Sequence, residues 1–168
     1  MKTILPVLGM LALTALPAVA HHDGDIFRSA DIRVSHAHTD EPSPTAHAIE
    51  VYLTIDNTGE EVDRLTAASV SFADPGVFQA HVIGADGTLG VTDVSAIAIE
   101  PGQSVSLAPG GARIVFFDVK RTLDGGDHFH MTLTFERAGT FEVEVDVEHD
   151  HHDEEHDHGH DHDEETAS

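Results

Sequence analysis

Two stretches of the chain alternate strictly between apolar and polar side chains, and this period of two constrains the fold more than any other feature. The first runs from Ile49 to Ile55 and the second from Phe141 to Val147. Successive side chains of a strand point to opposite faces, so each stretch offers one face to a core and the other to solvent. No helical periodicity of useful length occurs elsewhere. The sequence therefore predicts an all-β fold.

Shorter runs, bounded by turn-forming residues, predict six more strands. They lie around Asp31–His36, Arg64–Phe72, Phe78–Ile83, Ser104–Leu107, Ala112–Val119 and His128–Glu136. The breaks carry Asn57-Thr58-Gly59, Asp74-Pro75-Gly76, Asp86-Gly87, Pro101-Gly102, Pro109-Gly110-Gly111, Asp124-Gly125-Gly126 and Ala138-Gly139. Short strands at this spacing predict a Greek-key β-sandwich or barrel.

The first twenty residues have the three parts of a secretory signal. Lys2 is the positive start, Ile4 to Leu16 is the apolar stretch, and Ala18-Val19-Ala20 fits the small-residue cleavage pattern. The apolar stretch is too short, and too interrupted by proline, to span a membrane. We therefore expect cleavage after Ala20, export to a periplasm, and no membrane insertion of the mature chain.

The rest of the chain divides into three regions. A short His/Asp-containing segment covers residues 21–25, a body covers 26–147, and a tail covers 148–168. The body, roughly 120 residues long, has the length of a single domain.

The tail consists almost entirely of imidazoles and carboxylates. Between Glu148 and Glu165, seven of eighteen residues are His and ten are Asp or Glu. With no apolar side chain to bury, this segment is expected to be disordered. Neutral imidazole binds Zn, Cu and Ni, and carboxylates add oxygen donors, so the composition predicts a metal-binding tail. The predicted ligands are His149, His151, His152, His156, His158, His160 and His162. A solvated acidic tail is the alternative, but it does not explain the histidines.

The net charge and the absence of cysteine restrict the partners and the metal ligands that the chain can have. The formal net charge is −23, and loss of Lys2 with the signal makes it −24. Such a surface repels nucleic acid and anionic lipid and attracts cations. The chain has no Cys, so any metal must be held by nitrogen, oxygen or Met sulfur.

Several short motifs follow one another through the body in a specific order. They are Val51-Tyr52-Leu53-Thr54-Ile55-Asp56-Asn57, Asp63-Arg64-Leu65, His81, Asp86-Gly87, Ile99-Glu100-Pro101-Gly102, Leu107-Ala108-Pro109-Gly110-Gly111, Gly126-Asp127 and Leu133-Thr134-Phe135-Glu136-Arg137-Ala138-Gly139. This ordered set resembles the periplasmic copper chaperones of the PCu(A)C type. The resemblance implies a cupredoxin-like β-sandwich that delivers copper toward the CuA site of respiratory oxidases and is a binding protein, not an enzyme.

The resemblance also implies a copper site made by one His, one Met and a His-x-Met pair after the Pro-Gly-Gly turn. His81 occupies the first position, but Val91 falls on the Met, and Arg113 and Val115 fall on the pair. A Met-rich site suits Cu(I) because thioether sulfur is soft. With three of the four implied ligands absent, His and carboxylate ligands favour Cu(II) or Zn(II) instead.

One pair of candidate ligands begins a predicted strand. His128 and His130 flank Phe129, so both project from one face and can share a metal. Met131 points to the opposite face and is predicted to lie in the core. Exposed strand-end histidines are the equal alternative for this pair.

His36 and His38 have the same spacing, in a stretch before Pro42 and Pro44 that is predicted to be irregular. Metal binding and simple exposure remain open for them too. His47, which opens the next strand, is interpreted as a surface residue.

Cleavage after Ala20 would leave His21 and His22 at the start of the mature chain. The α-amino group and imidazole of His21 could chelate one copper. A flexible arm that captures metal is the favoured interpretation of this pair.

Together these features predict a periplasmic metal-binding protein, a copper chaperone or carrier that captures Cu(II) and passes it to a partner. A respiratory-oxidase assembly factor or a metal transporter is the expected kind of partner, and zinc is the second candidate metal. A general divalent-metal buffer, or a protein-interaction module whose tail alone binds metal, are the alternatives. An enzyme is not favoured, because the chain has neither a Cys nucleophile nor a Gly-x-Ser-x-Gly motif.

Overall fold

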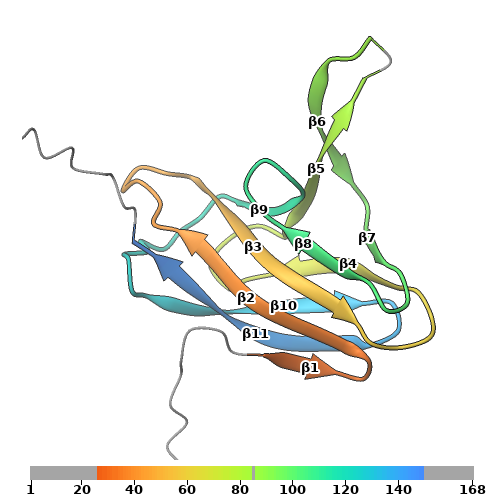
Figure 1. The fold of residues 1–168 in the computed structure, drawn as a ribbon. Coiled ribbons are helices and arrows are strands. Elements are labelled where there is room, and N and C mark those ends of the chain that lie inside the picture. The colour runs from red at the N-terminus through yellow and green to blue at the C-terminus, as the bar shows by residue number, and fades with distance from the viewer. Residues whose placement is uncertain (1–25, 85, 150–168) are drawn as a thin grey trace, which may run out of the picture.

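The computed structural model describes residues 26–84 and 86–149, and every helix or strand in these ranges is a β-strand (Figure 1). The strands are β1 (Phe27–Ser29), β2 (Ile32–Asp40), β3 (Ala48–Asn57), β4 (Asp63–Ser69), β5 (Val77–Ile83), β6 (Leu89–Val94), β7 (Ile97–Ile99), β8 (Ser104–Leu107), β9 (Arg113–Phe117), β10 (His128–Phe135) and β11 (Gly139–Glu148). Among the described residues, no helix is long and apolar enough to cross a membrane. The predicted all-β fold class is confirmed.

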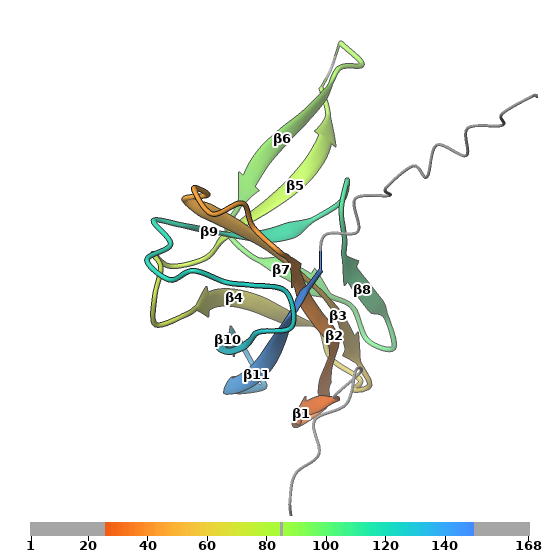
Figure 2. The same ribbon diagram turned by 90° about the vertical axis from the view of Figure 1, so that its left-hand side faces the viewer.

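The described strands join into one continuous sheet in the order β6-β5-β9-β3-β2-β11-β10-β4-β7, with β1 paired to β2 and β8 to β3. The long strand β3 changes partner along its length, because Ala48–Val51 pairs with β9 and Leu53–Asp56 pairs with β8. β11 runs parallel to β2, although the two are far apart in sequence. The sheet folds over on itself, so that β4, β10 and β11 lie across from β9 (Figure 2).

The core lies inside this fold and uses the faces that the alternating pattern predicts. Val51, Leu53 and Ile55 are at most 1% exposed, and so are Val143 and Val145. Burying each such side chain contributes about 1.5–3 kcal/mol to stability. Because these residues alternate mainly with polar ones, the same strands have a second, more polar face, on which Tyr52 of β3 is also buried.

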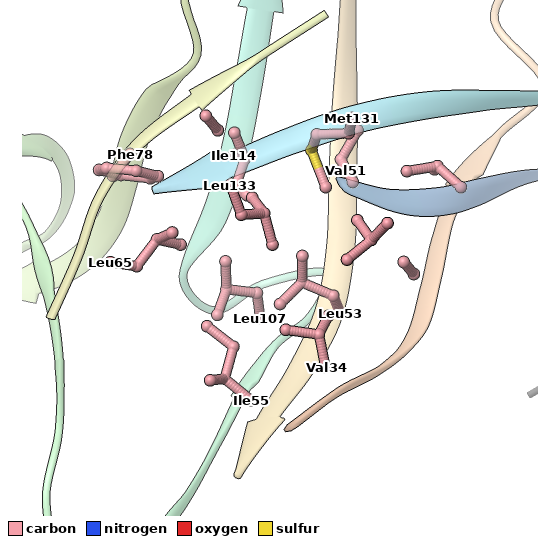
Figure 3. Packing of buried hydrophobic residues seen from close by; sticks show 14 of the residues in the cluster. Val34, Val51, Leu53, Ile55, Leu65, Phe78, Leu107, Ile114, Met131 and Leu133 are labelled. Atoms are coloured by element: carbon pink, nitrogen blue, oxygen red, sulfur yellow. The ribbon is translucent and has the colours of Figure 1, made fainter. Parts of the chain in front are cut away.

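Met131 is fully buried among the aliphatic side chains of this core (Figure 3). Its predicted place in the core is confirmed. The thioether is therefore turned away from the face that carries His128 and His130.

Three strands were not predicted from the sequence. β1 and β7 have three residues each, too few to show a period of two. β6 has no fully buried residue, because the β5–β6 hairpin projects away from the sandwich (Figures 1 and 2). An apolar–polar alternation arises only where one face of a strand meets a core.

β2 is longer than predicted, so the expectation that His36 and His38 lie in an irregular stretch is wrong. The strand continues to Asp40, and the irregularity is a β-bulge between Ser35 and His38. His36 takes a positive φ of 53° within the bulge. An extra residue in one strand reverses which faces the following side chains occupy. At the other end of the body, β11 includes Glu148, one residue beyond the predicted boundary.

Candidate metal centre

His81 lies on β5, partly exposed, beside the turn that joins β8 to β9. Pro109 and Gly110 form this turn, in which Gly110 has a φ of 75° and the N–H of Gly111 donates to the carbonyl of Ala108. A positive φ at the third turn position requires glycine, which explains the Pro-Gly motif. The carbonyl oxygen of Gly110 is thereby placed 2.5 Å from Nδ1 of His81.

This contact determines which nitrogen of His81 can bind a metal. A carbonyl oxygen only accepts hydrogen bonds, so Nδ1 of His81 is the donor. The lone pair of the neutral ring is then on Nε2. Backbone carbonyls orient metal-binding histidines in the same way in many sites.

The other positions of the implied copper site hold no metal ligand. Val91 lies directly opposite His81 in the β5–β6 ladder. Val115 is 4% exposed and is packed into the sheet. The residues present do not fit a Met-rich Cu(I) site, because His81 is the one ligand of the four that remains.

Arg113 has a different role in the structure. Its Nε lies 3.1 Å from Oε1 of Glu50, at an angle that makes this an ion pair without a hydrogen bond. One of its terminal nitrogens donates to Oε1 of Gln79 at 3.2 Å. The side chain is mostly buried, so the guanidinium fixes β9 between β5 and β3.

Tyr52 extends this polar network along the outer face of β3. Its hydroxyl donates to Oε2 of Glu50 at 2.6 Å, and its ring centroid lies 5.5 Å from that of His38. Burial, reinforced by the hydrogen bond to Glu50, raises the pKa of Tyr52. The phenol therefore stays protonated in the physiological pH range and is a hydrogen-bond donor, not a metal ligand.

A second set of possible ligands lies on the outer face of β10, β11 and β2. His128 and His130 are both exposed on one face of β10, as the sequence predicts. Asp146 and Glu144 on β11 are their direct cross-strand partners. His38 on β2 is paired with Asp146 from the other side.

The remaining candidates are scattered or lie outside the described residues. His47 precedes β3, away from both groups, and is exposed, as the sequence predicts. His149 is exposed, with Nδ1 3.8 Å from a carboxylate oxygen of Glu41. Outside the described ranges lie His21, His22, His151, His152, His156, His158, His160 and His162. Over residues 26–84 and 86–149, no three His, Asp or Glu side chains already meet as the ligands of one metal ion would.

Comparison with known proteins identifies the family. Residues 32–147 match the LpqE-like family, described as "Putative lipoprotein LpqE-like". The chain belongs to the LpqE-like family. No curated protein sequence matches it.

Solved structures similar to this LpqE-like protein include PCuAC domains. The apo domain from PmoF1 is 25% identical, with a TM-score of 0.66, and the match covers 74% of this chain and 99% of that one. The copper-bound domain from PmoF2 is 24% identical, with a TM-score of 0.64 and coverages of 74% and 98%. DR1885 from Deinococcus radiodurans in its apo form is 21% identical, with a TM-score of 0.56 and coverages of 89% and 97%, and a Cu(I) form is also solved. The resemblance to the PCu(A)C type is confirmed.

The sequence alone did not indicate that Asp146, Glu144 and Tyr52 lie beside the candidate histidines. In the sequence, Asp146 and Glu144 are only polar residues of an alternating strand. Ala138-Gly139 marks a tight turn, and a hairpin closed there pairs His128 with Asp146, as the structure shows. That register was a signal available in the sequence.

Proposed function

We propose that this LpqE-like protein is an exported copper carrier that binds its cargo through imidazole and carboxylate groups. The observation that carries the proposal is its similarity to the copper-bound PCuAC domain from PmoF2, nearly all of which is matched. The family's description as a lipoprotein supports export. Nothing in the proposed activity requires catalysis, since capture and release of an ion form or break no covalent bond of a substrate.

The choice of ligands follows from this chain's own residues. His81 keeps a ring nitrogen available at the family position, whereas Val91, Arg113 and Val115 offer neither sulfur nor a lone pair. Nitrogen and oxygen ligands suit Cu(II) and Zn(II) better than Cu(I). We therefore propose Cu(II) as the preferred cargo, captured by the tail histidines and passed to a partner of the kind that assembles respiratory oxidases or transports metals.

Replacing the seven tail histidines, His149 to His162, by Gln is expected to lower the stoichiometry of Cu(II) binding by several equivalents. The reason is that the tail holds seven of the fifteen imidazoles of the chain. Competition titrations of the mature chain and this variant with Cu(I), Cu(II) and Zn(II), each separately, give the measurement. Equal stoichiometry in both proteins would refute capture by the tail.

Adding His81→Ala to the tail variant tests whether the body binds copper itself or is only a docking domain. If His81 is part of a rebuilt copper site, this substitution removes one further equivalent of Cu(II). If no Cu(II) remains even before the substitution, the body is a docking domain. A preference for Zn(II) over Cu(II) in the same titrations would instead make the protein a zinc buffer.

Acidification is expected to release the captured metal. Only neutral imidazole binds a metal, so protons compete with the ion as pH falls through the range in which histidine titrates. The fraction of Cu(II) retained by the mature chain should drop between about pH 7.5 and about pH 5. Dialysis against buffers across this range measures it, and flat retention would rule out binding by imidazole.

A further inference from the structure

The outer face of β10, β11 and β2 carries a row of ligands that is independent of His81. We call the group His128, Asp146, His38, His130 and Glu144 the outer-face group. His128 on β10 is paired with Asp146 on β11, and Asp146 is paired with His38 on β2. In the register of these three strands, Asp146 thus lies between the two histidines.

The spacing of these three strands allows side chains from all of them to reach one metal ion. Neighbouring strands are about 4.7–4.9 Å apart, so the backbones of His128 and His38 are separated by about 10 Å with Asp146 between them. Imidazoles that lean toward each other across this gap can both reach an ion above the carboxylate. His130 is two residues from His128 on the same face, about 7 Å along the strand, and is diagonal to Asp146.

The tautomer of His38 is already suitable. Its Nδ1 lies 3.0 Å from the carbonyl oxygen of His36 and therefore donates to it. Nε2 is left with the lone pair that a metal needs.

Glu144 adds negative charge next to His130. Its side chain is 10% exposed, and Oε2 lies 3.9 Å from Nε2 of His130. A buried carboxylate next to a ligating imidazole orients the ring and stabilises a bound cation. No Lys or Arg belongs to the five positions of the group, so its formal charge with neutral imidazoles is negative.

We propose that His128, Asp146 and His38 bind one divalent cation of the Zn(II) or Cu(II) class on this face, with His130 completing a tetrahedral set. Three nitrogens and one carboxylate oxygen match the preference of these borderline ions. His128, Asp146 and Glu144 are already engaged with neighbouring groups in the structure. Binding therefore exchanges these contacts for metal bonds by rotation of side chains, which in exposed residues is fast. The site goes beyond the proposed copper cargo, since it needs neither His81 nor the tail.

The test uses the full mature chain in which the histidines outside the body, His21, His22 and the seven of the tail, are replaced by Gln. In this background, Co(II) is expected to bind as one equivalent with the intense visible absorption of tetrahedral coordination, and Zn(II) to displace it. His128→Ala and Asp146→Asn should each weaken Zn(II) binding more than about 100-fold, a larger loss than removal of a supporting group causes. His130→Ala should weaken it by at least about 10-fold.

A matched control separates this site from other histidines of the body. His47→Ala removes an exposed histidine off this face and should leave Zn(II) affinity unchanged. The proposal is overturned if the background binds no Co(II), or if His81→Ala abolishes binding while His128→Ala does not. Failure of Cu(II) capture by the unmodified chain would refute the copper carrier without affecting these results. His128 is exposed, so its replacement should not destabilise the fold. Unfolding midpoints equal to that of the background protein would confirm that the variants are folded.

Discussion

Replacing Asp63 by Ala is expected to lower the free energy of unfolding by about 3–5 kcal/mol, because it leaves three backbone N–H groups without their acceptor. Asp63 is 3% exposed. Its Oδ1 accepts from the N–H of Arg64 at 2.7 Å and of Arg137 at 2.9 Å, and Oδ2 accepts from that of Ala138 at 2.9 Å. Hydrogen bonds to a charged group are worth about 1.5–3 kcal/mol each, and buried donors left unpaired add a desolvation cost.

Urea unfolding followed by circular dichroism measures the effect of Asp63→Ala. Asp93→Ala is the matched control, because Asp93 is an exposed aspartate on β6 that accepts one side-chain hydrogen bond from Gln79. The free energy of unfolding of the control should stay within about 0.5 kcal/mol of that of the parent protein. An equal, small effect of both substitutions would show that the turn between β10 and β11 does not depend on Asp63.

The position of Asp63 connects the stability of the fold to the face that we propose to bind a metal ion. Arg137 and Ala138 belong to the turn that joins β10 to β11, and Asp63 is the first residue of β4, the strand that pairs with β10. The carboxylate therefore holds closed the hairpin on which His128 and Asp146 lie. Nothing in the sequence motif Asp63-Arg64-Leu65 indicates this role, because two of the three donors are more than seventy residues away.

The parts of the fold that the sequence predicts are those in which the core imposes a pattern. Val51 and Val143 alternate with polar neighbours because one face of β3 and of β11 is buried. The β5–β6 hairpin has no such face, and Ile83 and Leu89 are 77% and 70% exposed. For that reason the sequence shows no apolar–polar alternation over β6, and this strand is not predicted.

The candidate site was harder to predict because two of its determinants are not local. A strict period of two from Val34 would turn both His36 and His38 toward the core, and only the bulge places them outside. The pairing of His38 with Asp146 joins parallel strands across more than a hundred residues. The pairing of His128 with Asp146, in contrast, follows from a single tight hairpin.

The triple substitution Val91→Met, Arg113→His and Val115→Met is expected to create a Cu(I) site that the protein lacks. The new side chains would supply the two thioethers and the second imidazole that the PCu(A)C resemblance implies, beside a His81 whose Nε2 is available. Thioether sulfur prefers Cu(I) over harder ions. In the background without histidines at the termini, Cu(I) uptake should rise from substoichiometric to one equivalent, measured against a chromophoric Cu(I) competitor.

A volume-matched variant, Val91→Leu, Arg113→Gln and Val115→Leu, is the control, and it should bind no Cu(I). Both variants lose the ion pair of Arg113 with Glu50 and enlarge a buried position, which costs about 1–3 kcal/mol. Comparing the two therefore isolates the ligands from the strain. Uptake by the Met variant alone would mean that three side chains separate this protein from a soft-metal chaperone on an otherwise competent backbone. Absence of uptake by both would mean that the β5–β6 hairpin and β9 no longer hold these positions close enough to share an ion, so that the fold itself has moved away from Cu(I).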